Sequence, residues 1–160
     1  MKKTLSRTAG VFLVLSAAAG AQAASVGGFV GTDAGVYYQT TRAANGSAVR
    51  YGLTGLGLFS RQVVVAGEAA YLQDFATTAP GTFGSLTPYY GAGVSAGLEL
   101  GASNAFTVYP HGLLGLRYNT ATPLSFFGEV NAGVSARLGS ASSFGFGAGA
   151  RIGLNYNLGN

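Results

Sequence analysis

Polar and apolar residues alternate along most of the chain after its first two dozen residues, and this alternation limits the folds open to it. In the clearest stretch, Leu124 to Leu138, Val130 and Val134 share one phase, whereas Glu129 and Arg137 share the other. Successive side chains of a β-strand point to opposite faces, so this stretch predicts a strand with one apolar and one polar face. Seven segments alternate in this way: residues 26–39, 48–59, 62–72, 88–100, 105–118, 124–138 and 143–158.

The order of these segments favours one sheet of consecutive antiparallel strands. Turn-forming stretches such as Asn45-Gly46 separate the segments, and no helical periodicity occurs between them. Strands that follow one another at short intervals form an up-and-down meander. We therefore expect an all-β fold.

The chain begins with the composition of an export signal. Three basic residues occur among the first seven, an apolar run covers residues 9–19, and Ala21-Gln22-Ala23 follows it. This succession is typical of a secretory signal peptide, and the run is too short to span a bilayer as a retained helix. We expect residues 1–23 to be a cleaved signal peptide and residues 24–160 to form one domain.

Charge is scarce once the signal peptide is set aside. Six arginines, five acidic residues and no lysine remain in residues 24–160. A soluble domain has far more, about 25% charged residues. The near balance of the two signs leaves no basic patch of the kind that binds nucleic acid. Cysteine is absent, so disulfides cannot close the fold of this exported chain.

These observations together point to a membrane barrel. No second apolar run is long enough for a transmembrane helix, and a closed barrel satisfies every backbone group in lipid. The predicted fold is a single antiparallel up-and-down transmembrane β-barrel of eight strands, because bacterial single-chain barrels have even strand numbers. Since seven segments are visible, either residues 25–47 contain two short strands or part of residues 73–87 forms the eighth.

The apolar phase places aromatic residues near the strand ends. The pairs are Tyr51 and Phe59, Phe106 and Tyr118, and Phe144 and Tyr156. The separation of twelve residues in the last two pairs, at about 3.3 Å rise and about 40° tilt, spans roughly 30 Å, close to the apolar band between the aromatic girdles of membrane barrels. We therefore expect the apolar face to meet lipid and the charged face to line the lumen.

The expected lumen contains positive and negative residues in equal number. They are Asp33, Arg50, Glu68, Glu99, Arg117, Glu129, Arg137 and Arg151. Buried charges persist when they are paired and hydrogen-bonded, and side chains fill the interior of an eight-stranded barrel. We expect a structural charge network that fills the lumen; the alternative is a gated polar path. Glycines of the same phase, among them Gly147 and Gly153, leave room for Tyr89, Tyr109 and Phe127.

The connections between the segments differ in length. Residues 40–47 and 73–87 form long connections, and the connection between them is tight. Membrane barrels have short periplasmic turns and longer external loops, so this order predicts a periplasmic N-terminus and external long loops. In the second loop, Asp74, Phe75 and Phe83 are candidates for external recognition, because loops carry binding residues.

Few residues suggest catalytic or metal chemistry. His111 is the single histidine, and the run Tyr109-Pro110-His111-Gly112 contains no serine that it could activate. One histidine without cysteine does not make a zinc site of the usual type. The glycines of residues 145–149 are similar to a phosphate-binding loop, but no helix pattern follows them. We expect no enzymatic activity, no cofactor and no bound metal.

With its signal peptide, alternating strands, aromatic girdles and polar lumen, the chain resembles the small bacterial outer-membrane β-barrel superfamily, which contains the porin-like and OmpA/OmpX-like barrels. The resemblance covers residues 24–160 and implies an outer-membrane location, with outer-membrane lipids and the assembly machinery as partners. One departure concerns the C-terminus. Family members often end in an aromatic residue that the machinery reads, whereas Tyr156 lies four residues before the end.

The resemblance and the expected lumen predict a structural or surface-interaction role. The alternatives are a small channel for ions or small solutes and, ranked third, a barrel enzyme that acts on lipids. Nucleic acid is not an expected partner, and the sequence names no surface ligand.

Overall fold

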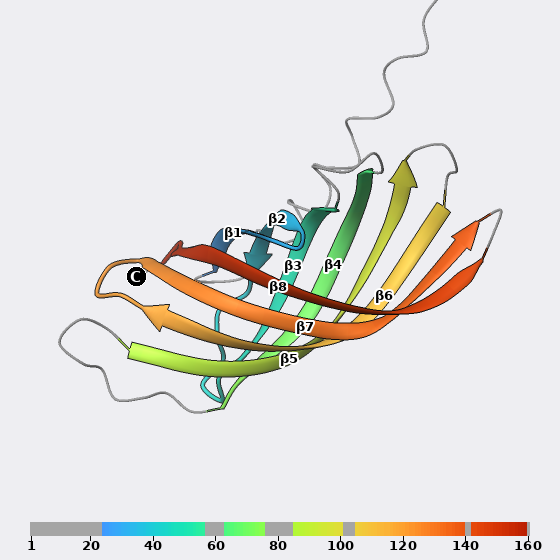
Figure 1. The fold of residues 1–160 in the computed structure, drawn as a ribbon. Helices are drawn as coiled ribbons and strands as arrows, with labels where there is room; N and C mark the ends of the chain where they lie inside the picture. The colour runs from blue at the N-terminus through green and yellow to red at the C-terminus, as the bar shows by residue number, and fades with distance from the viewer. Residues whose placement is uncertain (1–23, 57–62, 76–84, 101–104, 140–141, 160) are drawn as a thin grey trace, which may run out of the picture.

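The computed structural model describes residues 24–56, 63–75, 85–100, 105–139 and 142–159, which contain eight strands and no helix. Each strand pairs in antiparallel with the next, and β1 pairs with β8, so the sheet closes into a barrel (Figure 1). The predicted all-β, up-and-down, eight-stranded barrel is confirmed. The strands are β1 (Ser25–Gly31), β2 (Ala34–Gln39), β3 (Ser47–Leu56), β4 (Val63–Asp74), β5 (Ser85–Leu100), β6 (Ala105–Asn119), β7 (Leu124–Gly139) and β8 (Ser143–Asn157).

The first alternating segment, residues 26–39, is two strands rather than one. Thr32 and Asp33 form a bend between them, and Val30 pairs with Ala34 across this bend. Of the two positions expected for the eighth strand, the first is therefore correct.

A glycine allows the chain to bend this close to its neighbour. A Cβ on Gly31 would lie 2.0 Å from the carbonyl oxygen of Ala150 on β8, so no larger residue fits there. The alternation nevertheless continues through the bend, because Phe29, Asp33 and Tyr37 are all buried and all share one phase. This continuity explains why the sequence displays a single segment.

Both termini of the barrel lie at one end, which we call the termini end. Ser25 pairs with Gln39 of β2 and with Asn157 of β8, and the N–H of Leu158 donates to the carbonyl of Ala24 at 2.7 Å. The connections after β2, β4 and β6 are at this end. The connections after β1, β3, β5 and β7 are at the opposite end, which we call the far end.

This placement corrects the predicted sidedness of the loops. The additional strand within residues 26–39 moves every later connection to the opposite end of the barrel. The long connections after β2 and β4 therefore share an end with the N-terminus. The prediction that the N-terminus is periplasmic while the long loops are external is therefore wrong. The sequence shows one strand too few, and one additional strand reverses the direction of all strands that follow it.

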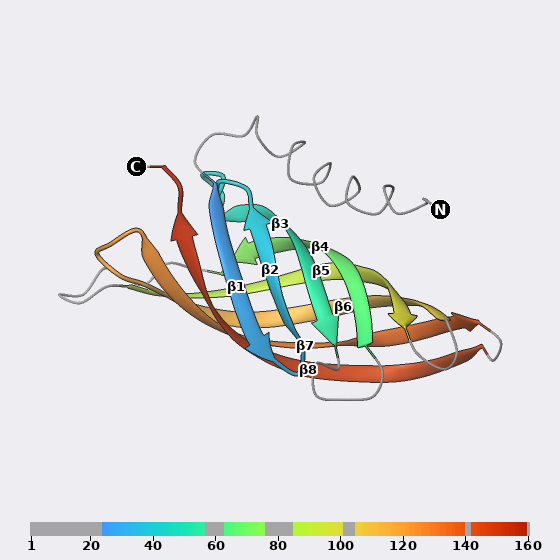
Figure 2. The same ribbon diagram turned by 90° about the horizontal axis from the view of Figure 1, so that it is seen from above.

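The strands differ in length, so the wall is higher on one side. β1 and β2 contain 7 and 6 residues, whereas β5 and β7 contain 16 each. β8 pairs with β1 only from Arg151 to Asn157, and its first half continues beyond the bend. The long strands project past the short pair at the far end (Figure 2). Within the described ranges, the sheet is a full ring near the termini end and a curved sheet without β1–β8 pairing at the far end.

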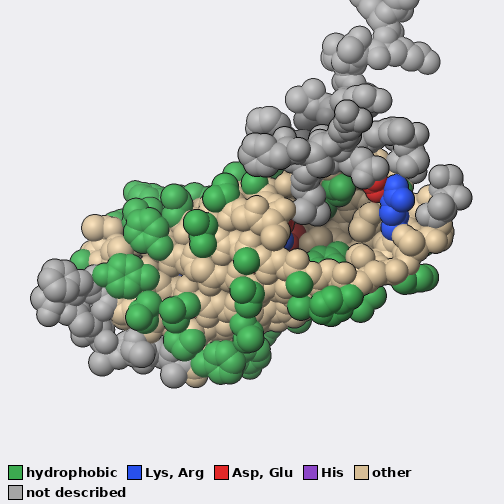
Figure 3. Space-filling view, viewed as in Figure 1, with side chains coloured by type: hydrophobic (Ala, Val, Ile, Leu, Met, Phe, Trp, Pro, Cys, Tyr) green, Lys and Arg blue, Asp and Glu red, His purple; other side chains and the backbone are tan. Residues whose placement is uncertain are grey.

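The outer wall is apolar. Val65, Leu114 and Ile152 are 51%, 56% and 66% exposed, and hydrophobic side chains cover the wall seen in Figure 3, whereas charged ones show in the hollow at the far end. Further exposed apolar side chains are Tyr51, Leu53, Tyr71, Leu86, Tyr90, Val94, Leu98, Phe106, Leu116, Phe126, Val130, Val134, Leu138, Phe144, Phe146, Leu154 and Tyr156. Phe59 lies outside the described residues. No helix within the described ranges is long and apolar enough to cross a membrane.

Large side chains in the lumen lie opposite glycines on the neighbouring strand. Tyr89 pairs with Gly115, and Phe127 pairs with Gly153. A Cβ on Gly115 would lie 2.2 Å from Cζ of Tyr89, and a Cβ on Gly153 would lie 2.5 Å from the Phe127 ring. The rings therefore occupy the volume that the glycines leave, as expected for a barrel filled by its own side chains.

Replacing Gly115 with alanine is expected to lower the free energy of unfolding by about 1–3 kcal/mol, because the new methyl group would overlap the Tyr89 ring. Gly67→Ala and Gly128→Ala are matched controls, since a Cβ at either position meets nothing within 4 Å. Urea unfolding of the folded protein in detergent micelles measures the difference. An equal decrease in the free energy of unfolding for Gly115→Ala and Gly128→Ala would show that overlap with the Tyr89 ring does not cause the loss of stability.

Candidate functional site: a charged network in the lumen

The inward phase of the strands collects charged residues from the whole chain in the lumen. All described charged residues make ion pairs, in three groups that follow one another along the barrel. The central layer contains Asp33, Arg50, Glu68, Glu129 and Arg151; the termini layer contains Arg42, Asp74 and Arg117; the far layer contains Glu99 and Arg137.

Arg151 on β8 is the hub of the central layer. Its Nε and Nη2 donate to the two oxygens of Asp33 at 2.8 and 2.6 Å. Its Nη1 and Nη2 donate to the two oxygens of Glu68 at 2.9 and 2.7 Å. Both contacts are bidentate, the geometry in which guanidinium and carboxylate bind most strongly. Arg151 thereby joins β8 to the β1–β2 bend and to β4.

Arg50 and Glu129 form the second half of this layer. Nη1 of Arg50 donates to Oε2 of Glu129 at 2.9 Å, and the Tyr89 hydroxyl donates to the same oxygen at 3.1 Å. Oε1 of Glu129 lies 3.6 Å from Nη1 of Arg151, which connects the two halves. All these side chains are buried, so the pairs are shielded from the solvent that weakens surface ion pairs.

Aromatic rings complete the surroundings of the two arginines. The Arg50 guanidinium carbon lies 4.8 Å from the centre of the Tyr37 ring and 5.3 Å from that of Phe127. The corresponding carbon of Arg151 lies 4.5 Å from the centre of the Phe29 ring. Ring faces attract cations, most strongly where water is excluded. The central layer is therefore a closely packed block of ion pairs across the lumen.

The termini layer is centred on Asp74, the last residue of β4. Arg42 donates to Asp74 at 2.6 Å and Arg117 donates to it at 3.0 Å. Arg42 also donates to the carbonyl of Gly46 at 2.9 Å. Burial, together with the neighbouring Arg117, lowers the pKa of Arg42 to about 10, so that Arg42 stays charged at neutral pH. Asp74, considered above for an external recognition loop, thus binds arginines at the mouth of the lumen.

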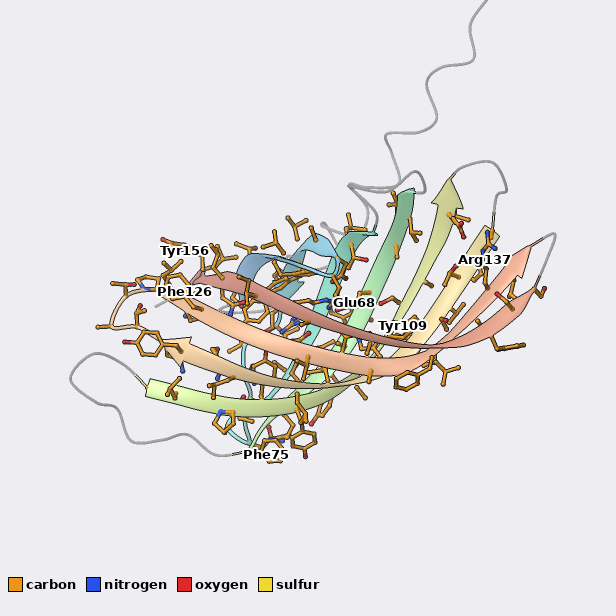
Figure 4. All side chains as sticks on the ribbon, viewed as in Figure 1. Glu68, Phe75, Tyr109, Phe126, Arg137 and Tyr156 are labelled. Carbon is orange, nitrogen blue, oxygen red and sulfur yellow. The ribbon has the colours of Figure 1, made fainter. Side chains whose placement is uncertain are left out.

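The other residues of that candidate loop have different surroundings. Phe75 is 61% exposed, and its ring lies 4.6 Å from that of Tyr90, beside the outer wall of β5 (Figure 4). Phe83 lies outside the described residues. The described part of the loop therefore contributes an exposed aromatic residue at the termini end.

Among the described residues, the far layer is the pair of Glu99 and Arg137. Nε and Nη2 of Arg137 donate to Glu99 at 2.7 and 3.0 Å. The Arg137 side chain is 33% exposed, because β7 here belongs to the open part of the sheet. Figure 4 shows Arg137 near the far end, with Glu68 and Tyr109 deeper in the barrel and Phe126 and Tyr156 towards the termini end.

A cavity of about 240 Å³, which we call the vestibule, lies in the lumen towards the far end. Asp33 and Arg151 of the central layer form part of its wall, and most other polar groups are hydroxyls and amides. The lining residues are Thr32, Asp33, Thr54, Val64, Ala66, Ser95, Gly97, Thr107, Tyr109, Asn131, Ser135, Gly147, Ala148, Gly149 and Arg151. The lumen is thus hollow at one end and filled at the other.

His111 is buried and stacks on Tyr109, with the ring centres 4.9 Å apart. Its Nδ1 lies 3.1 Å from the backbone carbonyl oxygen of Tyr109. No serine contacts it among the hydrogen bonds of the described residues. In the same part of the chain, no group of three or more His, Cys, Asp or Glu residues is arranged to hold a metal ion.

Sequence reasoning did not assign Arg42 and Asp74 to the network. Asp74 shares the phase of Glu68, so extending the alternating segment by two residues beyond Leu72 would have found it. Arg42 lies on a connection that turns back at Gly46, where φ is 82°. Alternation carries no signal for such a turn.

No family model, curated protein or solved structure matches this chain.

Replacing Arg151 with glutamine is expected to lower the free energy of unfolding by about 3–5 kcal/mol, because it leaves the carboxylates of Asp33 and Glu68 buried without their cation. Arg137→Gln is the matched control. It removes a partly exposed pair, for which a loss of about 0–1 kcal/mol is expected. Urea unfolding in micelles compares the two; an equal loss at both positions would contradict the central role of Arg151.

Proposed function

We propose that this chain is an integral outer-membrane β-barrel protein with a structural or surface-interaction role and no enzymatic activity. The observation that carries the proposal is the division of the closed sheet into two faces. Large apolar side chains are exposed on the outer wall, whereas all described charged residues are paired within the lumen or at its mouth. In water this arrangement would expose a large apolar surface; in lipid it is the expected one.

The outer wall has the height that the proposal requires. Exposed aromatic residues lie near both limits of the apolar belt, as with Phe144 and Tyr156 on β8. Their separation corresponds to roughly 30 Å along the membrane normal at the usual rise and tilt. Outer-membrane lipids are then the partners of the belt, and the assembly machinery of the outer membrane inserts the chain.

The proposed orientation follows from the export signal and the topology. A chain exported through a cleaved signal at residues 1–23 would keep its termini on the periplasmic side, as the resemblance to small outer-membrane barrels implies. The far end, with the vestibule, would then face the exterior. A surface ligand would meet the hydroxyl-lined vestibule or the connections after β1, β3, β5 and β7.

The filled lumen favours this role over that of a channel. Arg50, Glu129 and Arg151 form a continuous block of ion pairs, and the termini layer lies behind it. An ion that passed would have to separate buried pairs, which is costly.

Cell fractionation tests the location. The protein, expressed with its own signal peptide, is expected in the outer-membrane fraction, released only by detergent and beginning at Ala24 by mass spectrometry. Recovery from the periplasm without detergent would overturn the proposal.

Planar-bilayer recording tests the filled lumen. Purified, folded protein is expected to give no discrete current steps, because the central layer blocks the lumen. Reproducible openings of constant size would favour the channel alternative over the structural role.

A further inference from the structure

The side of the central layer that faces the vestibule has an excess of negative charge. Arg151 binds the two carboxylates of Asp33 and Glu68, and these three side chains form the hub of the layer. Arg50 and Glu129 form a balanced pair beside the hub. The termini layer, in which two arginines share one acid, lies on the side away from the vestibule. The hub therefore has one more negative than positive charge.

The hub offers acceptors but no donors to a ligand. Nε of Arg151 donates to Asp33, Nη1 donates to Glu68, and Nη2 donates to both, so every nitrogen of this guanidinium is engaged. Each carboxylate oxygen can accept two hydrogen bonds. Asp33 lines the vestibule, as does Ser95, whose hydroxyl donates to Glu68 at 3.2 Å. Such a wall attracts a cation and repels an anion.

Two buried side chains of the vestibule wall have polar atoms without a partner. Thr54 on β3 is 4% exposed, and its hydroxyl makes no hydrogen bond to a described residue. Asn131 on β7 is 8% exposed. Its Oδ1 accepts from the Tyr109 hydroxyl at 3.0 Å, whereas its Nδ2 has no partner among the described residues. Because buried polar groups are normally hydrogen-bonded, these atoms mark contact points for a ligand.

The volume of the vestibule limits the size of this ligand. The 240 Å³ correspond to roughly eight water molecules at ~30 Å³ each. Sites for drug-sized molecules are larger, at about 300–1,000 Å³. One sugar ring or a compound of similar size fits, whereas an oligosaccharide does not. Glycines and methyl groups form much of the remaining wall, against which the C–H groups of a ring can lie.

We propose that the vestibule binds a small organic cation, with a primary ammonium group on a hydroxyl-bearing body the size of one sugar ring. The ammonium group donates to Asp33 and to the hydroxyl oxygen of Thr54, and a hydroxyl of the body accepts from Nδ2 of Asn131. The inference names a ligand class for the surface-interaction role. It rests on the proposed function, because the orientation given there turns the vestibule towards the exterior.

Two sugars of the same shape test the charge preference. Glucosamine and glucose share one ring and differ in an ammonium group that replaces a hydroxyl. Isothermal titration calorimetry of the folded protein in detergent micelles, at neutral pH, is expected to show glucosamine binding about tenfold or more tightly, because charge-assisted hydrogen bonds are the stronger ones. Equal binding of the two sugars would show that another group, such as His111, compensates the hub, and would overturn the proposal. So would loss of glucosamine binding in equimolar potassium chloride.

A valine variant tests the position of the ligand. Thr54→Val keeps the shape of the side chain and removes its hydroxyl, so glucosamine is expected to bind roughly two- to tenfold more weakly. Thr87→Val is the matched control. Thr87 is a buried lumen threonine at the termini end of β5, where it accepts from Asn119 at 3.1 Å, away from the vestibule. Equal affinities for the two variants would contradict the assigned site.

A second variant tests the excess charge. Glu68→Gln removes one negative charge from the hub without altering the lining of the vestibule, and Arg151 keeps its bidentate contact with Asp33. The ratio of glucosamine to glucose affinity is expected to fall to about one. A heat-dependent shift in gel mobility verifies that the variant is folded. An unchanged ratio would contradict the role of the hub, and the comparison of the two sugars on the wild type stands without this variant.

The outcomes separate this inference from the proposed function. A protein that resides in the outer membrane but does not bind glucosamine would overturn the inference alone. Recovery from the periplasm without detergent would overturn the proposed function, and with it the surface role of the site, whatever the affinity of the purified protein for glucosamine.

Discussion

Backbone pairing between β1 and β8 is the interaction on which the rest of this structure depends. Residues 25–31 lie along residues 151–157, and this contact converts a meander into a ring. Because side chains alternate along every strand, closure directs the side chains of one phase into the lumen and those of the other phase onto the outer wall. The same interaction sets the limits of the ring. β1 is short, so β1 and β8 close the wall only as far as β1 extends, and no described strand pairs with the first half of β8 on that side.

The lumen that results is narrow, and its contents are matched in size and in charge. Gly115 and Gly153 have no side chain, and the rings of Tyr89 and Phe127 on the neighbouring strands occupy the space where one would lie. Phe127 in turn lies against the guanidinium of Arg50, whose charge Glu129 compensates. Packing and charge pairing are therefore coupled, since a buried ion pair is tolerated only where further contacts surround it.

Much of the candidate site follows from the alternation, and its exceptions have local causes. Arg50, Glu68, Glu129 and Arg151 all share the inward phase, and all four are buried. The partners of each residue follow less directly. Arg117 binds Asp74 at the termini end rather than an acid of the central layer. Such pairings join strands that are distant in the sequence, and they depend on register and strand tilt, which a single strand does not encode.

The sequence by itself determined the two faces of this protein, because the period of two is a property of each strand alone. It also determined that charge belongs on one face only. Only the tertiary structure decided the position of the eighth strand, since the alternation passes through the bend at Thr32 and Asp33 without a break. That bend in turn decided which end holds the long connections and where the pairing between β1 and β8 ends. Strand number, register and closure arise between strands, so no pattern within one strand can express them.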